Sequence, residues 1–171
     1  MNWEYKHLLN NNFHPDSRVW VYQASRIFSL NEALEIEELL KEFTRQWKSH
    51  GTPVKGYAGL LFGQFIILIA DETASGVSGC STDSSVRIIK QVEEQFAVNI
   101  FDRQMLAFYI KEKVQLIPLT QLSYALENNY LNTDTLYFNN LVSTKKELLE
   151  KWIIPIKESW LTSRIKTKEK V

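Results

Sequence analysis

A shortage of cysteine is the first feature of this sequence. Cys80 is the only cysteine among 171 residues, so no disulfide can form within the chain. Nothing therefore indicates a secreted domain that disulfides stabilise. Excess charge is also missing, because 20 lysine and arginine residues balance 20 aspartate and glutamate residues. Without a net charge, the protein has no general attraction for nucleic acid or for an anionic membrane.

Long hydrophobic runs are missing as well. The longest, residues 65–70, is far too short to cross a bilayer, and residues 1–12 contain no apolar core of a signal peptide. The three histidines, His7, His14 and His50, are scattered and fit no metal-binding spacing. We therefore expect a cytoplasmic protein with no membrane contact, no metal and no cofactor.

The sequence does contain enough apolar material for a core. Hydrophobic residues make up 44% of the chain and aromatic residues 12%, which argues against disorder. The length fits one domain, or one domain with an appendage. Residues 1–17 are polar, and we expect an irregular arm there. The β-branched and aromatic residues of 19–25, V-W-V-Y-Q-A-S, predict a first strand.

The clearest element is a helix over residues 30–49. Ser29 and Glu32 have the spacing of a capping box, in which each side chain accepts a hydrogen bond from an amide at the helix start. Apolar residues then recur at helical spacing: Ile36, Leu39, Leu40, Phe43 and Trp47. We predict that Trp47 is buried, that Lys48 is exposed, and that Gly51 ends the helix in the left-handed conformation.

Two strands are expected next, over residues 54–62 and 64–70, with a hairpin turn at Gly63. A second helix is predicted from about Ser84, with apolar residues on one face. Two further strands are expected over residues 105–110 and 114–119. This order, β-α-β-β-α-β plus one strand, indicates an α+β fold with a ferredoxin-like split βαβ core.

We place this core at residues 18–119. Residues 120–171 are expected to form a helical appendage that ends in a short basic tail. Thr144 and Glu147 have the spacing of a second capping box, and Pro155 should kink or shorten the helix that follows.

Three stretches together carry a resemblance: S-R-V-W-V-Y-Q-A-S-R, W-K-S-H-G and S-G-C-S-T-D-S-S-V. Through them the sequence resembles a family of short, uncharacterised bacterial proteins that often carry the label "ABC transporter ATPase". The likeness extends over residues 17–160. It implies a coherent bacterial family, and its motifs imply no particular chemistry.

The ATPase label fails a physical test. Phosphate binding of that type needs the pattern G-x-x-x-x-G-K-[ST], in which the lysine contacts the β- and γ-phosphates. Here Gly76 and Gly79 are three residues apart, and the next lysine is Lys90. The sequence therefore excludes a P-loop ATPase.

Between the third predicted strand and the second helix lie residues 71–86, with the sequence D-E-T-A-S-G-V-S-G-C-S-T-D-S-S-V. Three interpretations of this segment stay open. In the first, Thr82 or Asp83 caps the helix and Cys80 fills a gap in the core. In the second, the positive end of the helix binds a small anion. The residues that would bind it are Ser78, Gly79, Ser81, Thr82 and Ser84.

The third interpretation is thiol chemistry. A cysteine just before a helix has its thiolate favoured by the helix dipole, which lowers the pKa of the thiol. The split βαβ topology places the corner around His50 at the same end of the sheet as Cys80. His50 would then serve as the base, with Asp83 or Asp71 orienting its ring.

The aromatic residues Trp20 and Tyr22 of the first strand suggest base stacking. RNA-binding sheets of this kind carry aromatic and basic residues on two strands, and the third strand here has no such motif. We expect these aromatics in the core and no nucleic acid as a partner.

The sequence thus predicts a module that binds a small anionic ligand or a protein partner through residues 71–86. A homodimer is left open. The alternative is a small cysteine-dependent enzyme with Cys80, His50 and Asp83 as its catalytic residues.

Overall fold

The computed structural model describes residues 5–9, 12–71 and 79–166 of the chain. It is a mixed helix and strand protein with antiparallel sheets, and it divides into two compact units. The N-terminal unit contains the chain up to Phe101 together with Asn140–Leu149. The C-terminal unit contains Asp102–Asn139 and the chain from Glu150 onward.

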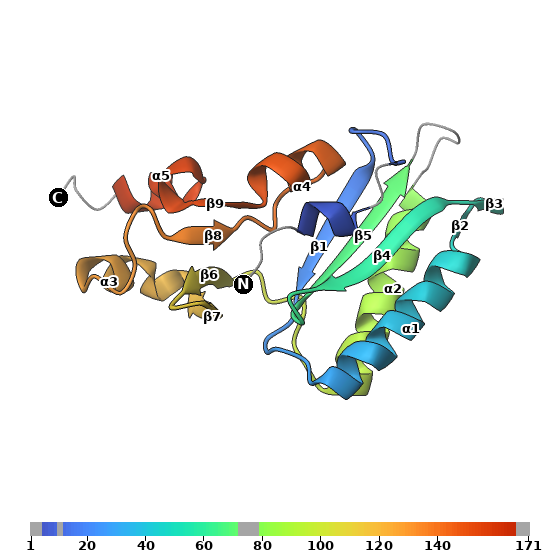
Figure 1. Cartoon of the computed structure of the whole chain (residues 1–171), viewed down its shortest axis with the longest axis horizontal. Coiled ribbons are helices and arrows are strands. Elements are labelled where there is room, and N and C mark those ends of the chain that lie inside the picture. Colours follow the sequence, from blue (N-terminus) through green and yellow to red (C-terminus); the bar gives the residue numbers. More distant parts are fainter. Residues whose placement is uncertain (1–4, 10–11, 72–78, 167–171) are drawn as a thin grey trace. The chain divides into compact units, whose positions relative to one another are not determined.

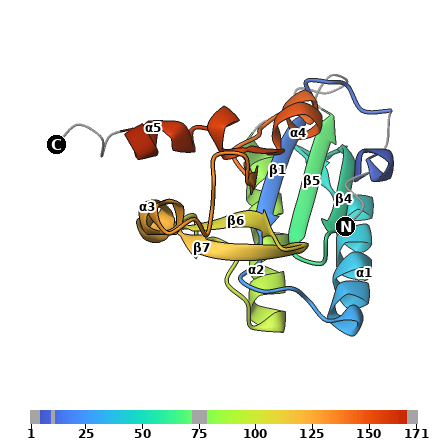
Figure 2. The ribbon, with the colours of Figure 1, turned by 60° about the vertical axis from the view of Figure 1, so that its left-hand side comes forward.

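The N-terminal unit is built on a three-stranded antiparallel sheet (Figures 1 and 2). Its order is β1 (Arg18–Gln23), β5 (Phe65–Asp71) and β4 (Lys55–Leu61). Every residue of β5 is buried, as its continuous apolar sequence requires of a central strand covered on both faces. Phe62 and Gly63, both with positive φ, lie in the three-residue turn 62–64 that joins β4 to β5. The predicted turn at Gly63 is therefore confirmed.

Two helices, α1 (Leu30–Gln46) and α2 (Gly79–Phe96), cover one face of this sheet. Alternate β5 residues point toward them, because successive side chains of a strand alternate between the two faces. The core on this face includes Ile66, Leu68 and Ala70 from β5, Ile36 and Leu40 from α1, and Ile89 and Val92 from α2.

The start of α1 confirms the predicted capping box. The Ser29 hydroxyl accepts from the Glu32 amide, and the Glu32 carboxylate accepts from the Ser29 amide at 2.8 Å. Trp47 is buried and Lys48 is exposed, as predicted.

The end of α1 differs from the prediction. The helix stops at Gln46, and the next residues form a small hairpin of β2 (Lys48–Ser49) and β3 (Thr52–Pro53). Gly51 does have positive φ, but so does His50 before it. Two consecutive left-handed residues make a two-residue hairpin turn rather than a helix stop.

The start of α2 also differs from the prediction. The helix begins at Gly79, not near Ser84, so Cys80 lies within its first turn instead of before it. The small polar residues there have weak helix propensity, which tertiary packing of the later apolar residues overrides. Most of the 71–86 segment after Val77 is therefore helix and not loop.

The opposite face of β5 is covered by the N-terminal arm. The arm contains a short 3-10 helix, η1 (Tyr5–Leu8), and buries the side chains of Tyr5, Leu9 and Phe13. The ring of Tyr5 packs on Phe62 at 6.1 Å, and its hydroxyl donates to the Leu148 carbonyl at 2.8 Å. The described residues of the arm thus bury side chains in the core.

The segment after Asn139 extends the sheet along the outer edge of β1. Arg18 pairs with Thr144 in an antiparallel bridge, and the Val19 amide donates to the Ser143 carbonyl at 2.9 Å. The segment leads into α4 (Lys145–Lys151). One half of the predicted capping box is present, because the Glu147 amide donates to the Thr144 hydroxyl at 3.2 Å, while the Glu147 carboxylate accepts from the Ser143 amide at 2.9 Å.

The C-terminal unit holds a four-stranded antiparallel sheet of order β7-β6-β8-β9. Its strands are β6 (Met105–Ile110), β7 (Lys113–Pro118), β8 (Leu136–Phe138) and β9 (Ile153–Pro155). The helical elements are η2 (Leu119–Gln121), α3 (Leu122–Glu127), η3 (Ile156–Glu158) and α5 (Leu161–Lys166). Its core includes Leu106, Phe108, Leu122, Tyr137, Ile156 and Leu161.

This arrangement corrects the predicted ferredoxin-like core. The strands β6 and β7, expected in the first sheet, pair instead with β8 and β9, so the strand order differs. The predicted helical appendage supplies those two short strands. Pro155 does shorten the helix, because α4 ends at Lys151 and β9 follows. Periodicity identifies a strand but not the strand with which it pairs, which is why the sequence misplaced β6.

Candidate ligand groove

An open groove of about 460 Å³ runs between α1 and α2 on the outer side of the N-terminal unit. Helix α1 and the residues just after it form one wall, and the first half of α2 forms the other. Its lining residues are Leu39, Glu42, Phe43, Gln46, Trp47, Lys48, Ser84, Arg87, Ile88 and Gln91. The volume lies within the range of small-ligand sites in proteins, about 300–1,000 Å³.

The base of the groove is aromatic and fixed in place. The Trp47 ring lies 4.8 Å from the Phe43 ring and 6.1 Å from the Trp20 ring, measured between centroids. Below it, Gly56 of β4 leaves room for the indole, because a Cβ at that position would lie 2.6 Å from Trp47 Cε3. Trp47 is only 2% exposed, so the groove has a rigid apolar base.

Two cations stand at the rim of the groove. Lys48 and Arg87 are both exposed, and across residues 12–71 and 79–166 neither of them forms an ion pair. Other cations of α1 are engaged: Lys41 pairs with Glu38 at 2.6 Å, and Arg45 pairs with Glu42 at 3.1 Å. The groove therefore offers the positive charge of Lys48 and Arg87, while its one lining carboxylate, Glu42, is paired with Arg45.

Two buried polar atoms beside these cations also have no hydrogen-bond partner in the described part of the chain. They are the indole Nε1 of Trp47, which lines the groove, and the hydroxyl Oγ of Ser49 in β2. A buried polar group left unpaired costs about 1–3 kcal/mol, so native structures rarely keep one without a reason. Trp47 and Ser49 are the immediate neighbours of Lys48 in the sequence.

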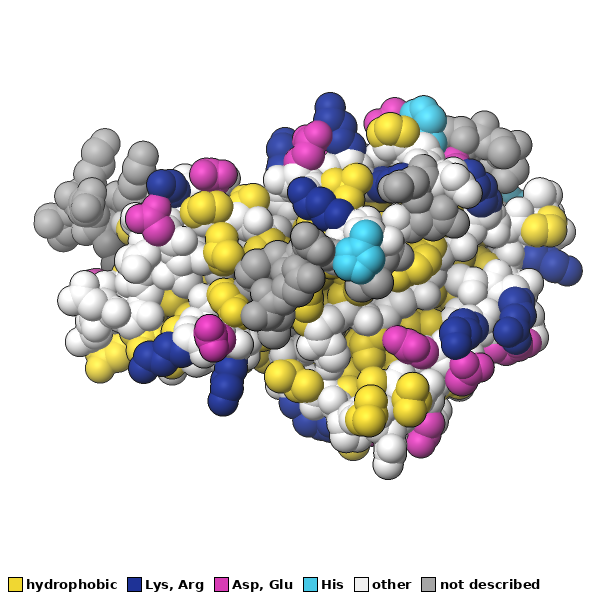
Figure 3. Space-filling view, in the orientation of Figure 1, with side chains coloured by type: hydrophobic (Ala, Val, Ile, Leu, Met, Phe, Trp, Pro, Cys, Tyr) yellow, Lys and Arg dark blue, Asp and Glu magenta, His cyan; other side chains and the backbone are white. Residues whose placement is uncertain are grey.

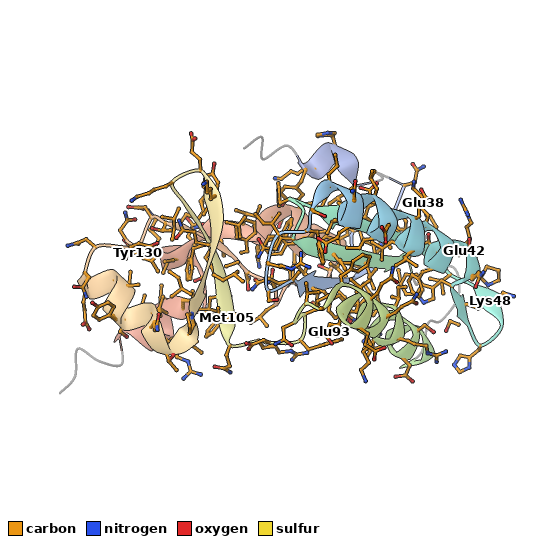
Figure 4. The ribbon with its side chains drawn as sticks, turned by 90° about the horizontal axis from the view of Figure 1, so that it is seen from below. Glu38, Glu42, Lys48, Glu93, Met105 and Tyr130 are labelled. Carbon is orange, nitrogen blue, oxygen red and sulfur yellow. The ribbon has the colours of Figure 1, made fainter. Side chains whose placement is uncertain are left out.

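Figures 3 and 4 show where the charged and apolar side chains of α1 lie. In Figure 4, Glu38, Glu42 and Lys48 follow one another toward the β2–β3 hairpin, while Glu93 lies on α2. In Figure 3, charged side chains of both signs gather over the α1 surface, with hydrophobic side chains toward the end where the helix begins. The exposed apolar residues there are Leu30 and Leu34.

The structure brings together two of the regions that the sequence singled out. Strand β2 contacts α2, and Lys48 and Ser84 line the same groove. This agrees with the expectation that the 48–53 corner and the start of α2 share one end of the sheet. His50 is exposed at the tip of the hairpin, with φ of 50°.

The remaining predicted site residues are placed as follows. Ser78 lies outside the described residues, and so do the side chains of Cys80 and Ser81 in the first turn of α2. Gly79 is the first residue of α2. Asp83 is exposed, and the Thr82 carbonyl accepts from the Ser85 hydroxyl at 2.7 Å. A composite site of Cys80, His50 and Asp83 stays a prediction.

Asp71 has a structural position. It is 4% exposed, its carboxylate pairs with Lys55 at 2.9 Å, and it accepts from the His14 amide at 3.4 Å. The Lys55 ammonium also donates to the Asn12 carbonyl. These bonds fasten the N-terminal arm to the edge of the sheet.

The sequence analysis did not predict most of the residues that line the groove, among them Phe43, Gln46, Arg87 and Gln91. The signal in α2 was present, because residues 84, 87, 88 and 91 recur at the three- and four-residue spacing of one helix face. What the sequence could not supply is the pairing of that face with the end of α1.

The described residues contain no group of three or more His, Cys, Asp or Glu side chains placed to hold a metal ion. None of their helices is both long enough and apolar enough to span a bilayer. No family model matches the chain, and neither a curated protein nor a solved structure matches it.

Proposed function

We propose that this protein is a binding module that holds a small anionic ligand with an aromatic or aliphatic body in the groove between α1 and α2. The observation that carries the proposal is the pairing of two exposed cations, Lys48 and Arg87, with the rigid aromatic base formed by Phe43 and Trp47. A carboxylate or phosphate is the group that matches the cations, and an apolar body matches the base.

The expected energetics favour such a ligand. Guanidinium and carboxylate groups form charge-assisted, often bidentate hydrogen bonds, which are stronger than neutral ones. Burying about 150 Å² of aromatic surface at about 25 cal/mol per Å² contributes about 4 kcal/mol before the costs of association. The groove is open, so the affinity for a small probe should be modest.

The proposal keeps the sequence-based idea of an anion site but moves it. Of the residues predicted to bind, only Ser84 lines the groove, and the charge comes from Lys48 and Arg87 instead of the amides of a loop.

The test uses two probes that differ only in charge: naphthalene-1-acetate and its uncharged amide. Isothermal titration calorimetry at low ionic strength should show the acid binding about tenfold more tightly than the amide, because only the acid gains charge-assisted hydrogen bonds. Arg87→Gln and Lys48→Gln should each weaken binding of the acid and leave binding of the amide unchanged.

The matched control is Lys90→Gln. Lys90 is exposed on the same helix as Arg87 but does not line the groove, so its loss should leave both probes unaffected. Equal affinity for acid and amide, or equal losses in Lys90→Gln and Arg87→Gln, would contradict the proposal.

A further inference from the structure

A second open groove, of about 590 Å³, continues from the first along α1. Leu39 and Glu42 line both, so the two form one furrow between the antiparallel helices α1 and α2. Its other lining residues are Leu34, Glu35, Glu38, Arg45 and Gln95. We call this continuous surface the α1–α2 furrow.

The two ends of the furrow carry opposite charge. Lys48 and Arg87 lie at the hairpin end, and Glu35 and Glu38 line the other end. Between them, Glu42 and Arg45 form an ion pair at 3.1 Å, so their charges offset each other. Glu38 pairs with Lys41 at 2.6 Å, but both side chains of that pair are more than half exposed. Exposed pairs of this kind contribute only about 0–1 kcal/mol, so a cationic partner can replace Lys41 at little cost.

Apolar residues connect the charged ends. Leu34, which is 56% exposed, begins the series, and Leu39, Phe43 and Trp47 continue it toward the hairpin. Leu34 thus adds exposed apolar surface at the acidic end of the furrow.

The length of the furrow decides what kind of ligand fits. At 1.5 Å per helical residue, the distance along α1 from Leu34 to Gln46 is about 18 Å. A single-ring acid fills only one end. An extended peptide rises about 3.3 Å per residue, so about six or seven residues reach from one charged end to the other.

We infer that the α1–α2 furrow binds a short peptide segment of another protein, with a carboxylate at Lys48 and Arg87, apolar side chains over Phe43 and Leu39, and a basic residue at Glu35 and Glu38. This inference rests on the proposed function and names the ligand class of the same site. The charge pattern fixes the direction of the peptide, because the reversed orientation places like charges together at both ends.

The experiment uses synthetic peptides as probes. One is K-K-L-F-A-L-E with a free C-terminal carboxylate, and the second is Q-Q-L-F-A-L-E, which lacks only the basic end. By calorimetry, the wild-type protein should bind the K-K probe about tenfold more tightly than the Q-Q probe. The double variant Glu35→Gln/Glu38→Gln should lose this preference and keep its affinity for the Q-Q probe.

Two further variants separate a binding role from a general change of charge. Glu37→Gln removes an exposed carboxylate of α1 that lies outside the furrow, and it should keep the preference for the K-K probe. Glu35→Lys/Glu38→Lys should reverse the preference, so that a third probe, E-E-L-F-A-L-E, binds more tightly than the K-K probe. A structural role of the two glutamates predicts no such reversal.

The outcomes distinguish this inference from the proposed function. If both peptides bind equally and both weaken in Arg87→Gln, the site takes anions but has no basic-end specificity, and the inference is overturned while the proposed function stands. If neither peptide binds although naphthalene-1-acetate does, the inference is also overturned. If the acid and its amide bind equally, the proposed function itself fails.

Discussion

The two faces of strand β5 are covered in different ways. On one face, α1 and α2 pack mainly through apolar side chains, with one polar contact between the Tyr22 and Ser85 hydroxyls at 3.5 Å. The α1–α2 furrow lies on the outer surface of those helices. On the other face, charged residues fasten the N-terminal arm: Asp71 pairs with Lys55, and the buried Lys145 ammonium donates to the Phe13 carbonyl at 2.8 Å. Both faces of β5 are fully buried.

The basic residues of the N-terminal unit also differ in whether they have partners within the protein. Lys145 and Lys55 are held by oxygen atoms of the protein and hold the arm in place. Lys48 and Arg87 are exposed and form no ion pair with any described residue, so their charge is available to a ligand. Hydrogen-bond and ion-pair partners, and neither residue type nor burial, distinguish the two sets of cations, because the Lys55 side chain is also 51% exposed.

The largest expected effect compares the two faces directly. Ile67→Ala, on the arm face, and Leu68→Ala, on the helix face, each remove a side chain with no solvent exposure. We expect each variant to lose about 2–5 kcal/mol in free energy of unfolding, because both leave a cavity. Urea unfolding monitored by circular dichroism measures this loss. A cost below about 1 kcal/mol for Ile67→Ala alone would show that the arm does not pack on the sheet.

The next effect tests the buried cation. Lys145→Met keeps an unbranched side chain, one atom shorter, but leaves the Phe13 carbonyl without its donor, so we expect a loss of about 1–3 kcal/mol. The neighbouring Lys146 is exposed, and Lys146→Met should change stability by less than about 0.5 kcal/mol. Equal effects of the two substitutions in urea unfolding would contradict the structural role of Lys145.

A smaller, pH-dependent effect is expected at the start of α1. The Arg26 side chain, together with the Ser29 amide, lowers the pKa of Glu32 from its usual 4.5 to about 2. Because the folded pKa is lowered, this stabilisation is fully present above about pH 5 and is lost as the pH falls toward 2. Glu32→Gln should therefore be less stable than wild type at pH 7, and the difference should disappear near pH 2. A difference that is constant over this pH range would contradict the account.

The smallest effect concerns the thiol hypothesis. A cysteine in the first turn of a helix has its thiolate favoured by the dipole, so the rate of reaction of Cys80 with iodoacetamide should have its midpoint below about pH 8.5. His50→Gln should move that midpoint upward if the histidine assists. A midpoint at or above the reference value would leave Cys80 without an activated thiol.

Local features of the fold could be predicted from the sequence. The Ser29–Glu32 capping box, the Gly63 turn and the apolar run of β5 depend on residues close together in the chain, and all are present in the structure. The partner of β6 depends on contacts with β8, nearly thirty residues later, and no local pattern encodes that choice. Three-residue strands such as β8 also carry too few residues to show a period.

For the candidate site, too, only the locally encoded features could be predicted from the sequence. The sequence pointed to the 48–53 corner and to Ser84, because glycine and hydroxyl residues mark turns and helix starts. It did not point to Arg87, since a single arginine on a helix surface is ordinary. The groove exists only because α1 and α2 lie side by side, which is a property of tertiary packing.

The most direct test of the proposed anion site is a nuclear magnetic resonance titration with naphthalene-1-acetate. The resonances to follow are the indole N–H of Trp47 and the guanidinium N–H of Arg87, with the indole of Trp152, fully buried in the other unit, as the internal reference. The account predicts that the Trp47 and Arg87 signals shift together and saturably with the acid, that the Trp152 signal stays in place, and that the Arg87 signal does not respond to the amide. A saturable shift elsewhere, with the Trp47 and Arg87 signals unchanged, would contradict it.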